Sequence, residues 1–463
     1  MRSINKMKQV LMFVITSLIF LNAEAKDKPN IVFILVDDMG YECVGSYGAL
    51  SYKTPQIDNL ASNGIQFENC VSNPLCSPTR LKLMTGLRNF RNYEHFAYID
   101  NDHDTFGNIM RRAGYSTCIS GKWQLNGLEN KDVIKDWDDK DKPNKLGFDE
   151  FCLWQFTLNR QEGERYANPK IDRNGTVLDL PEDAYGPDIF NDFVLDFIDR
   201  KKNEPFFIYY PMVLVHDPFV PTPDSKDWIH PDMRYKNDTA YFKDMVAYAD
   251  KMVGKVVVKL KELDLFDNTI VIFTGDNGTL SSITTKTDHG NIVGGKGTTT
   301  DAGTHVPLII SWPEEIEEAS HHEGLIEFCD FFPTIADVGS EKTEFNDGIS
   351  FLSLLKGEKY IDRETAVVHY NPMWAPNVQK NANQFARTLD YKLYQDGKFY
   401  YLAEDILEKY PIALNSLTAE QKEVYLKLKA EIDKLPKWDP SIPTKEYFKI
   451  PAMYRQNRNN DKD

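Results

Sequence analysis

A short segment of the chain combines a cysteine with a proline and an arginine at alternate positions. Residues 76–80 read Cys-Ser-Pro-Thr-Arg, and the turn Thr85-Gly86 follows shortly after. This frame singles out Cys76 and Arg80 as candidate reactive residues. Taken alone, a cysteine in such a frame is more often a buried thiol ahead of a turn. Its chemistry therefore depends on the partners that the rest of the chain supplies.

Carboxylate and amide side chains follow two apolar runs that read as core strands. Asp37-Asp38 comes directly after 30–36, and Asp276-Asn277 follows 269–274. Ligands of open α/β sheets bind beyond the carboxyl ends of strands, where these side chains would converge. Such an all-oxygen site suits a hard cation, Ca²⁺ rather than Zn²⁺. Either pair alone could simply form a turn, but two pairs after two core strands favour the cation site.

Three further polar residues occupy comparable positions. Lys122 follows a third predicted strand, and Lys296 lies in a loop rich in glycine and threonine. Lone lysines in loops are mostly solvated. Beside a cation site, however, each could attract an anion, and the interaction energy of two unit charges is about 4 kcal/mol at ~4 Å and an effective dielectric near 20. The loop around Lys296 is not a nucleotide-binding P-loop, because the required spacing is absent. His216 ends an apolar stretch and could donate a proton to a leaving oxygen, with a structural role as the alternative.

Strand and helix patterns alternate along the first three quarters of the chain. The predicted strands are 30–36, 116–120, 205–210, 269–274 and 306–311, and the predicted helices are 105–113, 188–202 and 239–263. The run 30–36 is apolar after Asn30, as in a strand buried on both faces of a parallel sheet. We therefore expect an α/β domain over 26–365, with a large, mostly parallel sheet flanked by helices.

The pattern changes after residue 365. Short strands are predicted at 366–370, 384–388, 391–395 and 398–402, with a hairpin turn at Asp396-Gly397. An amphipathic helix is expected over 418–435, and the tail from Arg455 is polar. These elements predict a small antiparallel subdomain with a helix over 366–463.

The bulk properties limit the location and the partners of the protein. Residues 1–25 have a basic start, an apolar stretch and an Ala-Glu-Ala site, which predicts a cleaved signal peptide and export to the periplasm or the exterior. No segment of the mature chain is expected to span a membrane. The net charge of −16 argues against nucleic acid as a partner. The six cysteines do not indicate a disulfide framework in a chain of this size.

The motifs, taken in their order, resemble those of the sulfatase family within the alkaline-phosphatase-like superfamily. The resemblance runs from about 29 to 405 and rests on Asp37-Asp38-x-Gly40, Cys76-x-Pro78-x-Arg80, Gly121-Lys122-Trp123, His216-x-Pro218, Asp276-Asn277-Gly278, and Lys296 with the Val306-Pro307 turn. Six motifs in the family's order are far more specific than any one of them.

The resemblance implies a role for each matching residue. Ca²⁺ would be bound by Asp37, Asp38, Asp276 and Asn277. A maturation enzyme would convert Cys76 to formylglycine, whose hydrated aldehyde attacks sulfur with one hydroxyl and expels sulfate through the other. Arg80 would steady this group, Lys122 and Lys296 would hold the sulfate, and His216 would assist the leaving alcohol. The cation and lysines would neutralise charge on the transferring group, and the covalent intermediate divides one difficult step into two.

The sequence departs from the family pattern at two positions. Gln124 stands where the family usually has histidine after Gly-Lys-Trp, and an amide cannot act as a base near neutral pH. His305 stands where the family often has arginine before Val-Pro.

The resemblance predicts a sulfatase that acts on a sulfated carbohydrate. His305, His369 and Arg387 are candidate sugar contacts, with a structural role as the alternative. Two other functions stay open: a phosphonate or phosphate ester hydrolase of the same superfamily, and a non-catalytic glycan-binding protein.

Overall fold

The computed structural model describes residues 28–158, 164–343 and 345–437. Its centre is a ten-stranded mixed sheet. In spatial order the strands are β12 (Ser320–Glu327), β2 (Ile65–Val71), β11 (His305–Ser311), β8 (Thr269–Gly275), β1 (Asn30–Val36), β7 (Phe206–Pro211), β3 (Ser116–Lys122), β4 (Glu150–Trp154), β5 (Ile171–Arg173) and β6 (Thr176–Val177).

The middle of this sheet is parallel. β1 pairs in parallel with β8 on one side and β7 on the other, and β3 continues the parallel order to β4. β11 is antiparallel to its neighbours β8 and β2. The five strands predicted in this part of the chain are confirmed, as is the mixed, mostly parallel sheet.

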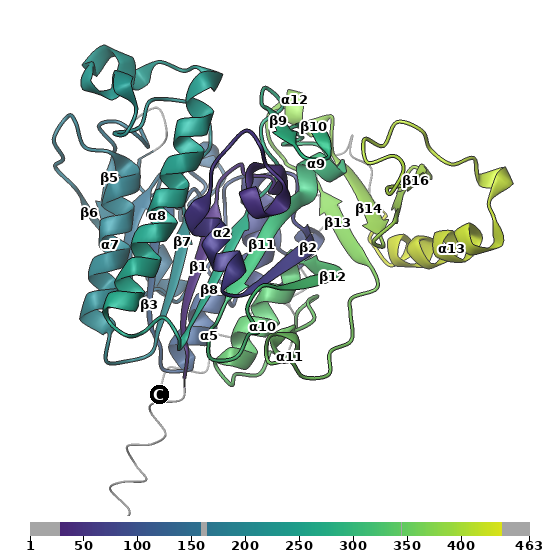
Figure 1. The fold of residues 1–463 in the computed structure, drawn as a ribbon, viewed down its shortest axis with the longest axis horizontal. Coiled ribbons are helices and arrows are strands. Elements are labelled where there is room, and N and C mark those ends of the chain that lie inside the picture. The colour runs from purple at the N-terminus through teal and green to yellow at the C-terminus, as the bar shows by residue number, and fades with distance from the viewer. Residues whose placement is uncertain (1–27, 159–163, 344, 438–463) are drawn as a thin grey trace, which may run out of the picture.

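Both faces of the sheet are covered by helices, as the apolar run of β1 predicts. Alternate residues of this strand enter different clusters: Val32 and Ile34 pack on one face, and Ile31 and Phe33 on the other. The first face is covered by α2 (Pro55–Ser62), α7 (Gly186–Lys201) and α8 (Phe242–Glu262), of which α7 and α8 lie side by side (Figure 1). The second is covered by α3 (Cys76–Thr85), α5 (Phe106–Arg112) and α10 (Phe331–Val338).

The predicted helix boundaries agree closely with those observed. Thr105 precedes α5 and closes a capping box with Asn108, which satisfies a free amide at the helix start. α8 begins at Phe242 rather than at Thr239, because Thr239–Tyr241 form a short 3₁₀ turn.

A second, four-stranded antiparallel sheet lies to the right of the large sheet in Figure 1. It consists of β13 (Ala366–Tyr370), β14 (Asn383–Arg387), β15 (Tyr391–Tyr394) and β16 (Phe399–Tyr401), and α13 (Ala419–Asp433) packs against it. Leu428 of α13 is buried with Leu393 and Phe399 of the sheet. The antiparallel sheet with its helix is thus confirmed, and the border at residue 365 stays a prediction.

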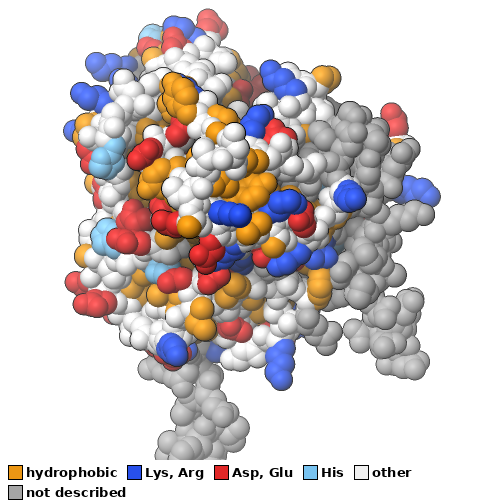
Figure 2. Space-filling view, turned by 90° about the vertical axis from the view of Figure 1, so that its right-hand side faces the viewer, with side chains coloured by type: hydrophobic (Ala, Val, Ile, Leu, Met, Phe, Trp, Pro, Cys, Tyr) orange, Lys and Arg blue, Asp and Glu red, His pale blue; other side chains and the backbone are white. Residues whose placement is uncertain are grey.

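No helix of the described residues is long and apolar enough to cross a membrane. The predicted signal peptide and the tail from Arg455 lie outside the described residues. All six cysteines are described, buried and unpaired. On the face shown in Figure 2, acidic and basic side chains are interspersed over the described atoms.

Glu327, at the end of β12, is a buried junction between three elements. Its carboxylate lies 2.7 Å from Nζ of Lys82 in α3, 3.1 Å from Nη2 of Arg88 and 3.0 Å from Nη1 of Arg363, which precedes β13. Burial alone would raise the pKa of Glu327, but the three cations hold it well below its usual range. A lowered pKa means that its contribution to stability is full above the unfolded-state pKa and is lost as the pH falls through the folded value.

Replacing Glu327 with alanine should lower the free energy of unfolding by about 3–5 kcal/mol, because three cations lose their buried partner. Urea unfolding followed by circular dichroism measures this change. Glu323→Ala, at an exposed position of the same strand, is the control and should cost less than about 1 kcal/mol. Equal stabilities of the two variants would contradict the prediction.

Candidate active site

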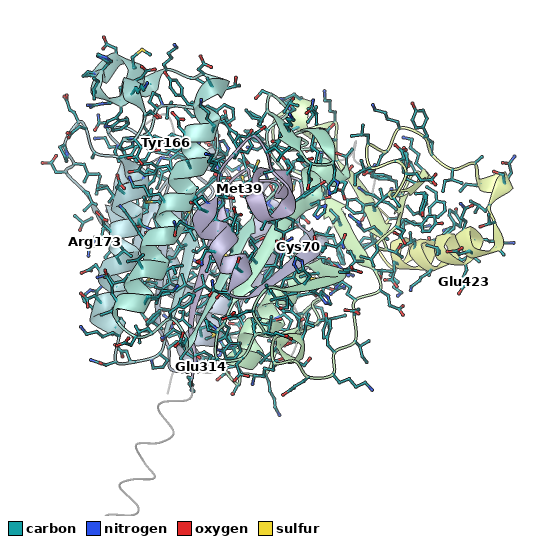
Figure 3. All side chains as sticks on the ribbon, viewed as in Figure 1. Met39, Cys70, Tyr166, Arg173, Glu314 and Glu423 are labelled. Atoms are coloured by element: carbon teal, nitrogen blue, oxygen red, sulfur yellow. The ribbon has the colours of Figure 1, made fainter. Side chains whose placement is uncertain are left out.

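The candidate residues meet at the carboxyl ends of the parallel strands. Asp37 and Asp38 follow β1, Asp276 and Asn277 follow β8, and Lys122 ends β3. The β1–β8 register pairs Val36 with Gly275, so the two acidic turns leave the sheet at the same level. In Figure 3, Met39 marks this end in the upper part of the molecule, and Glu314 marks the opposite end.

The oxygen atoms of the two acidic turns form a buried cluster. The backbone N of Asp38 donates to Oδ1 of Asp276 at 3.0 Å, and Nδ2 of Asn277 donates to Oδ1 of Asp38 at 2.9 Å. Asp38 adopts a left-handed φ of 63°, which turns the chain sharply at this point. Burial and the neighbouring carboxylates raise the pKa of Asp276 well above its usual value.

This cluster fits a hard cation. Oδ1 of Asp37 and Oδ1 of Asn277 are buried and make no hydrogen bond to the described residues. A buried oxygen without a donor is costly, and Ca²⁺ takes such carboxylate and amide oxygens as ligands. Three carboxylates crowded together also require positive charge nearby.

Two lysines and a histidine surround the acidic cluster. Nζ of Lys122 donates to Oδ2 of Asp37 at 2.6 Å, and Nζ of Lys296 donates to Oδ2 of Asp38 at 2.5 Å. Burial would raise the pKa of Asp37, but Lys122 in particular keeps it below its usual range. Nε2 of His216 lies 3.0 Å from Nζ of Lys296. Burial lowers the pKa of His216, with Lys296 acting in the same direction, although Asp38 opposes them.

Cys76 is the first residue of α3 and faces this cluster. Its Sγ and single oxygen atoms of Asp37 and Asp276 all lie within 4.8 Å of one another. Sγ is also 3.8 Å from Oε1 of Gln124. Nη1 of Arg80, one turn along the helix, donates to the carbonyl oxygen of Lys122 at 2.7 Å. All ten residues of α3 are buried, so the sequence frame 76–80 is held inside the protein.

A cavity of about 430 Å³ opens beside these groups. Its polar and aromatic lining includes Cys76, Gln124, Glu129, Arg165, His216, Asp217, Lys296, Trp374 and Lys380. Residues 374–381, between β13 and β14, form one wall, so the C-terminal sheet contributes to the cavity as well.

The three predicted sugar contacts lie elsewhere. His305 lies 3.1 Å from Asp301 through Nδ1 and stacks on Tyr41 at 4.0 Å between ring centroids. Arg387 is buried, and its Nη1 lies 2.8 Å from Oδ1 of Asp301. His369 is buried, and its Nδ1 lies 2.8 Å from Oε1 of Gln384. None of the three lines the cavity, so the structure favours the structural alternative for each of them.

Several lining residues were not among the predicted ones. Arg165 and Asp217 supply charge, and Trp374 stacks on Phe96 with ring centroids 4.6 Å apart. Asp217 could have been found from its place beside His216, since it lies in the same motif. Arg165 stands in a segment with no recognisable pattern. The signal for Trp374 is its aromatic ring, which could stack on a sugar, although aromatic residues lie mostly in the core.

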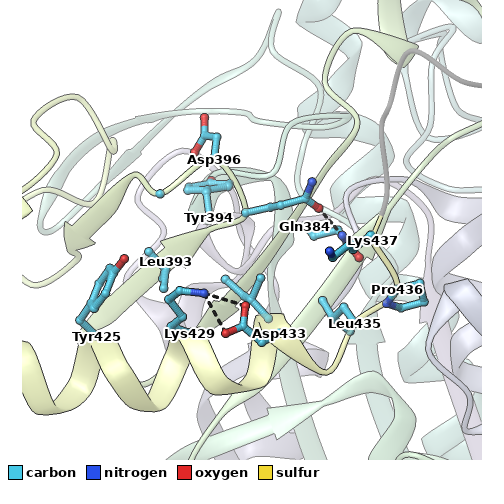
Figure 4. Close-up of a pocket in the computed structure, with 13 residues that line it drawn as sticks. Gln384, Leu393, Tyr394, Asp396, Tyr425, Lys429, Asp433, Leu435, Pro436 and Lys437 are labelled. Carbon is cyan, nitrogen blue, oxygen red and sulfur yellow. Dashed lines mark hydrogen bonds and ion pairs between the residues drawn. The ribbon is translucent and has the colours of Figure 1, made fainter.

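A second cavity, of about 380 Å³, lies between α13 and the C-terminal sheet (Figure 4). Its charged residues Lys429 and Asp433 pair with each other at 2.7 Å. Neither the acidic cluster nor Cys76, His216 or Lys296 lines it, so the reaction site belongs to the first cavity.

Comparison with known proteins identifies the family of the chain. The sulfatase family model matches residues 29–340, and the model of the C-terminal region of N-sulphoglucosamine sulphohydrolase matches residues 296–437. The rat N-acetylgalactosamine-6-sulfatase is 29% identical over 84% of this chain and 78% of its own length. The N-acetylgalactosamine-6-O-sulfatase of Bacteroides thetaiotaomicron is 29% identical over 75% of this chain and 80% of its own length.

The fold of the chain is similar to that of solved structures. A solved structure in complex with its substrate D-glucosamine-2-N,6-O-disulfate superposes with a TM-score of 0.70, at 21% identity, over 88% of this chain and 98% of that one. The fold is alkaline-phosphatase-like, with a large mixed sheet and a small antiparallel sheet. The chain belongs to the sulfatase family and is an enzyme that hydrolyses sulfuric esters.

Proposed function

We propose that this enzyme removes sulfate from a sulfated carbohydrate, with formylglycine at position 76 and Ca²⁺ held by Asp37, Asp38, Asp276 and Asn277. One observation carries the proposal: the first residue of α3 lies against the acidic cluster, within 4.8 Å of two of its oxygen atoms. A nucleophile made from Cys76 would thus stand beside the cation that polarises the sulfate group.

The state of Cys76 supports a modified nucleophile. Burial raises the pKa of the thiol, although Lys122 opposes this effect. A protonated thiol is a poor nucleophile. Formylglycine at this position would supply a hydrated aldehyde, whose two hydroxyl groups provide a nucleophile toward sulfur as the sugar alcohol leaves and a route for the later release of sulfate. Arg80, fixed to the backbone of Lys122, would hold this group in place.

The surrounding side chains have complementary tasks. Lys122 and Lys296 would offset the charge of the sulfate group in a site that is already ordered. His216 lies on the cavity wall and would donate a proton to the departing sugar oxygen. Oδ1 of Asp217 lies 2.9 Å from Nδ1 of His216, where it would favour the protonated imidazole that this donation requires.

The cavity supports a substrate with one sulfated sugar at an accessible end. Its volume of about 430 Å³ and the wall that residues from 374–381 form on one side fit a terminal residue better than the middle of a long polyanion. Relatives named as N-acetylgalactosamine-6-sulfatases make a 6-O-sulfated hexosamine the first compound to test.

A panel of sulfated monosaccharides and disaccharides, assayed for sulfate release, tests the proposal. Release from at least one member by the wild type, and none by Cys76→Ala, is the expected result. Aryl phosphonate and phosphate esters belong in the same panel. Faster turnover of these esters than of every sulfate would favour the phosphonate or phosphate hydrolase, and binding without turnover would favour a glycan-binding protein.

Gln124 should affect turnover rather than substrate affinity. Its Oε1 lies 3.8 Å from Sγ of Cys76, so its amide would hydrogen-bond the group formed there. Gln124→Ala should lower kcat by roughly tenfold or more, because hydrogen bonds to charged groups are worth about 1.5–3 kcal/mol. Gln124→His should raise kcat if release of sulfate limits turnover.

Steady-state kinetics on the best substrate of the panel measure this effect, with Gln56→Ala, an exposed glutamine of α2, as the control. An unchanged kcat with a raised KM for Gln124→Ala would instead place Gln124 against the sugar.

A further inference from the structure

Arg165 has a buried hydrogen-bond donor without an acceptor. The residue is 7% exposed and lines the cavity with Cys76, His216 and Lys296. Its Nη1 lies 3.9 Å from Oδ2 of Asp37, which is too far for a hydrogen bond, and bonds to no other described residue.

Other buried arginines show how unusual this is. Among the described residues four arginines are buried. Nε of Arg363 donates to Asp330 at 2.9 Å, and Nη1 of Arg387 lies 2.8 Å from Asp301. Arg80 and Arg165 are the two that have buried nitrogens without acceptors, and both lie at the reaction site. A buried donor without a partner is costly, so we expect a ligand to supply the missing acceptor.

The position of Arg165 is set by the protein before any ligand arrives. The guanidinium lies 4.1 Å from the ring centroid of Trp154, at the end of β4. The hydroxyl oxygen of the next residue, Tyr166, lies 2.8 Å from the carbonyl oxygen of Val213 and 2.5 Å from that of His216, and its one proton is shared between these two acceptors. Tyr166 lies in the upper part of Figure 3, at the same end of the molecule as Met39. The segment that carries Arg165 is thereby attached to the loop that carries His216.

We propose that Arg165 donates a hydrogen bond to a non-bridging oxygen of the scissile sulfate group. This inference rests on the proposed function. Oδ2 of Asp37 lies 2.6 Å from Nζ of Lys122 and 3.9 Å from Nη1 of Arg165. Both cations therefore lie on the same side of the acidic cluster. A planar guanidinium suits an oxyanion with several acceptor oxygens. Arg165 and Gln124 both line the cavity, and because Gln124 is neutral, Arg165 supplies positive charge there.

The binding of inorganic sulfate to the metal-loaded, mature enzyme tests the role of Arg165. Calorimetry gives the affinity, and inhibition of turnover by sulfate gives an independent value. Arg165→Gln should weaken sulfate binding by roughly tenfold or more and lower kcat. Arg165→Lys keeps the positive charge but loses the planar, forked donors of the guanidinium, so its sulfate affinity should lie between those of Arg165→Gln and the wild type.

Arg173→Gln is the matched control, because Arg173 is exposed on β5 and pairs with Asp196; its sulfate affinity should equal that of the wild type. Wild-type sulfate affinity in Arg165→Gln would overturn the inference, even if turnover fell, because Arg165 would then face the sugar. If Arg165→Gln does not fold, Arg165→Lys decides, and wild-type affinity in that variant would overturn the inference too. A wild type that neither binds nor releases sulfate would instead refute the proposed function.

Discussion

Replacement of Cys76 with alanine is expected to reduce turnover by roughly a thousandfold or more, because the side chain proposed as nucleophile is removed. Cys76→Ser should be equally inactive unless the host modifies serine. The fold should persist, since the substitution removes one buried sulfur atom. Sulfate release from the best substrate measures the effect, and calorimetric melting shows whether the variants are folded.

Cys118→Ala is the matched control, because Cys118 is a buried cysteine of β3 that does not line the cavity. It should lose some stability and keep its turnover. The mass of the tryptic peptide that contains position 76 provides a second measurement. Fully active protein in which this peptide carries an unmodified cysteine would rule out formylglycine.

Removal of the cation should abolish activity and lower stability together. Asp37, Asp38 and Asp276 lie close to one another in a buried site, and like charges there repel strongly. Chelation should therefore lower the melting temperature of the wild type, and added Ca²⁺ should restore both melting temperature and turnover. Asp276→Ala should bind little metal and turn over at least roughly a hundredfold more slowly, as expected when a metal that stabilises transition-state charge is lost.

Elemental analysis with parallel assays checks this coupling. Asp267→Ala alters an exposed carboxylate that precedes β8, at the opposite end of the same strand. It should keep both metal and activity. Full activity after exhaustive chelation, with no metal detected, would contradict the Ca²⁺ assignment.

The sequence predicts those parts of the fold in which a single strand or helix has a recognisable pattern of apolar and polar residues. β1 is apolar at every position after Asn30, so both its burial and its place in the sheet are visible from the sequence. β12 reads Ser-His-His-Glu-Gly at its start, and this polar edge strand gives no such signal. Its pairing with β2 depends on the rest of the sheet, which local sequence does not contain.

The same distinction applies to the site. Asp37 and Asp276 could be assigned because each follows a recognisable strand. Arg165 could not, since its contacts Trp154 and Asp37 become neighbours only in the folded chain. For Arg387 the sequence leaves a sugar contact and a structural role open, because it does not show whether the partner of the guanidinium is a ligand or the buried Asp301.

The burial of α3 limits the stage at which Cys76 can be modified. Cys76 is 3% exposed and Arg80 1% exposed, and the remaining residues of the helix are buried with them. An enzyme that modifies Cys76 can therefore reach it only while this segment is still unfolded. If Cys76 becomes formylglycine as proposed, folding and modification would compete for the same stretch of nascent chain, and a molecule that folds first would keep an unmodified Cys76 and stay inactive. The yield of active enzyme should thus depend on how slowly the chain folds relative to its modification, in addition to how much of it is synthesised.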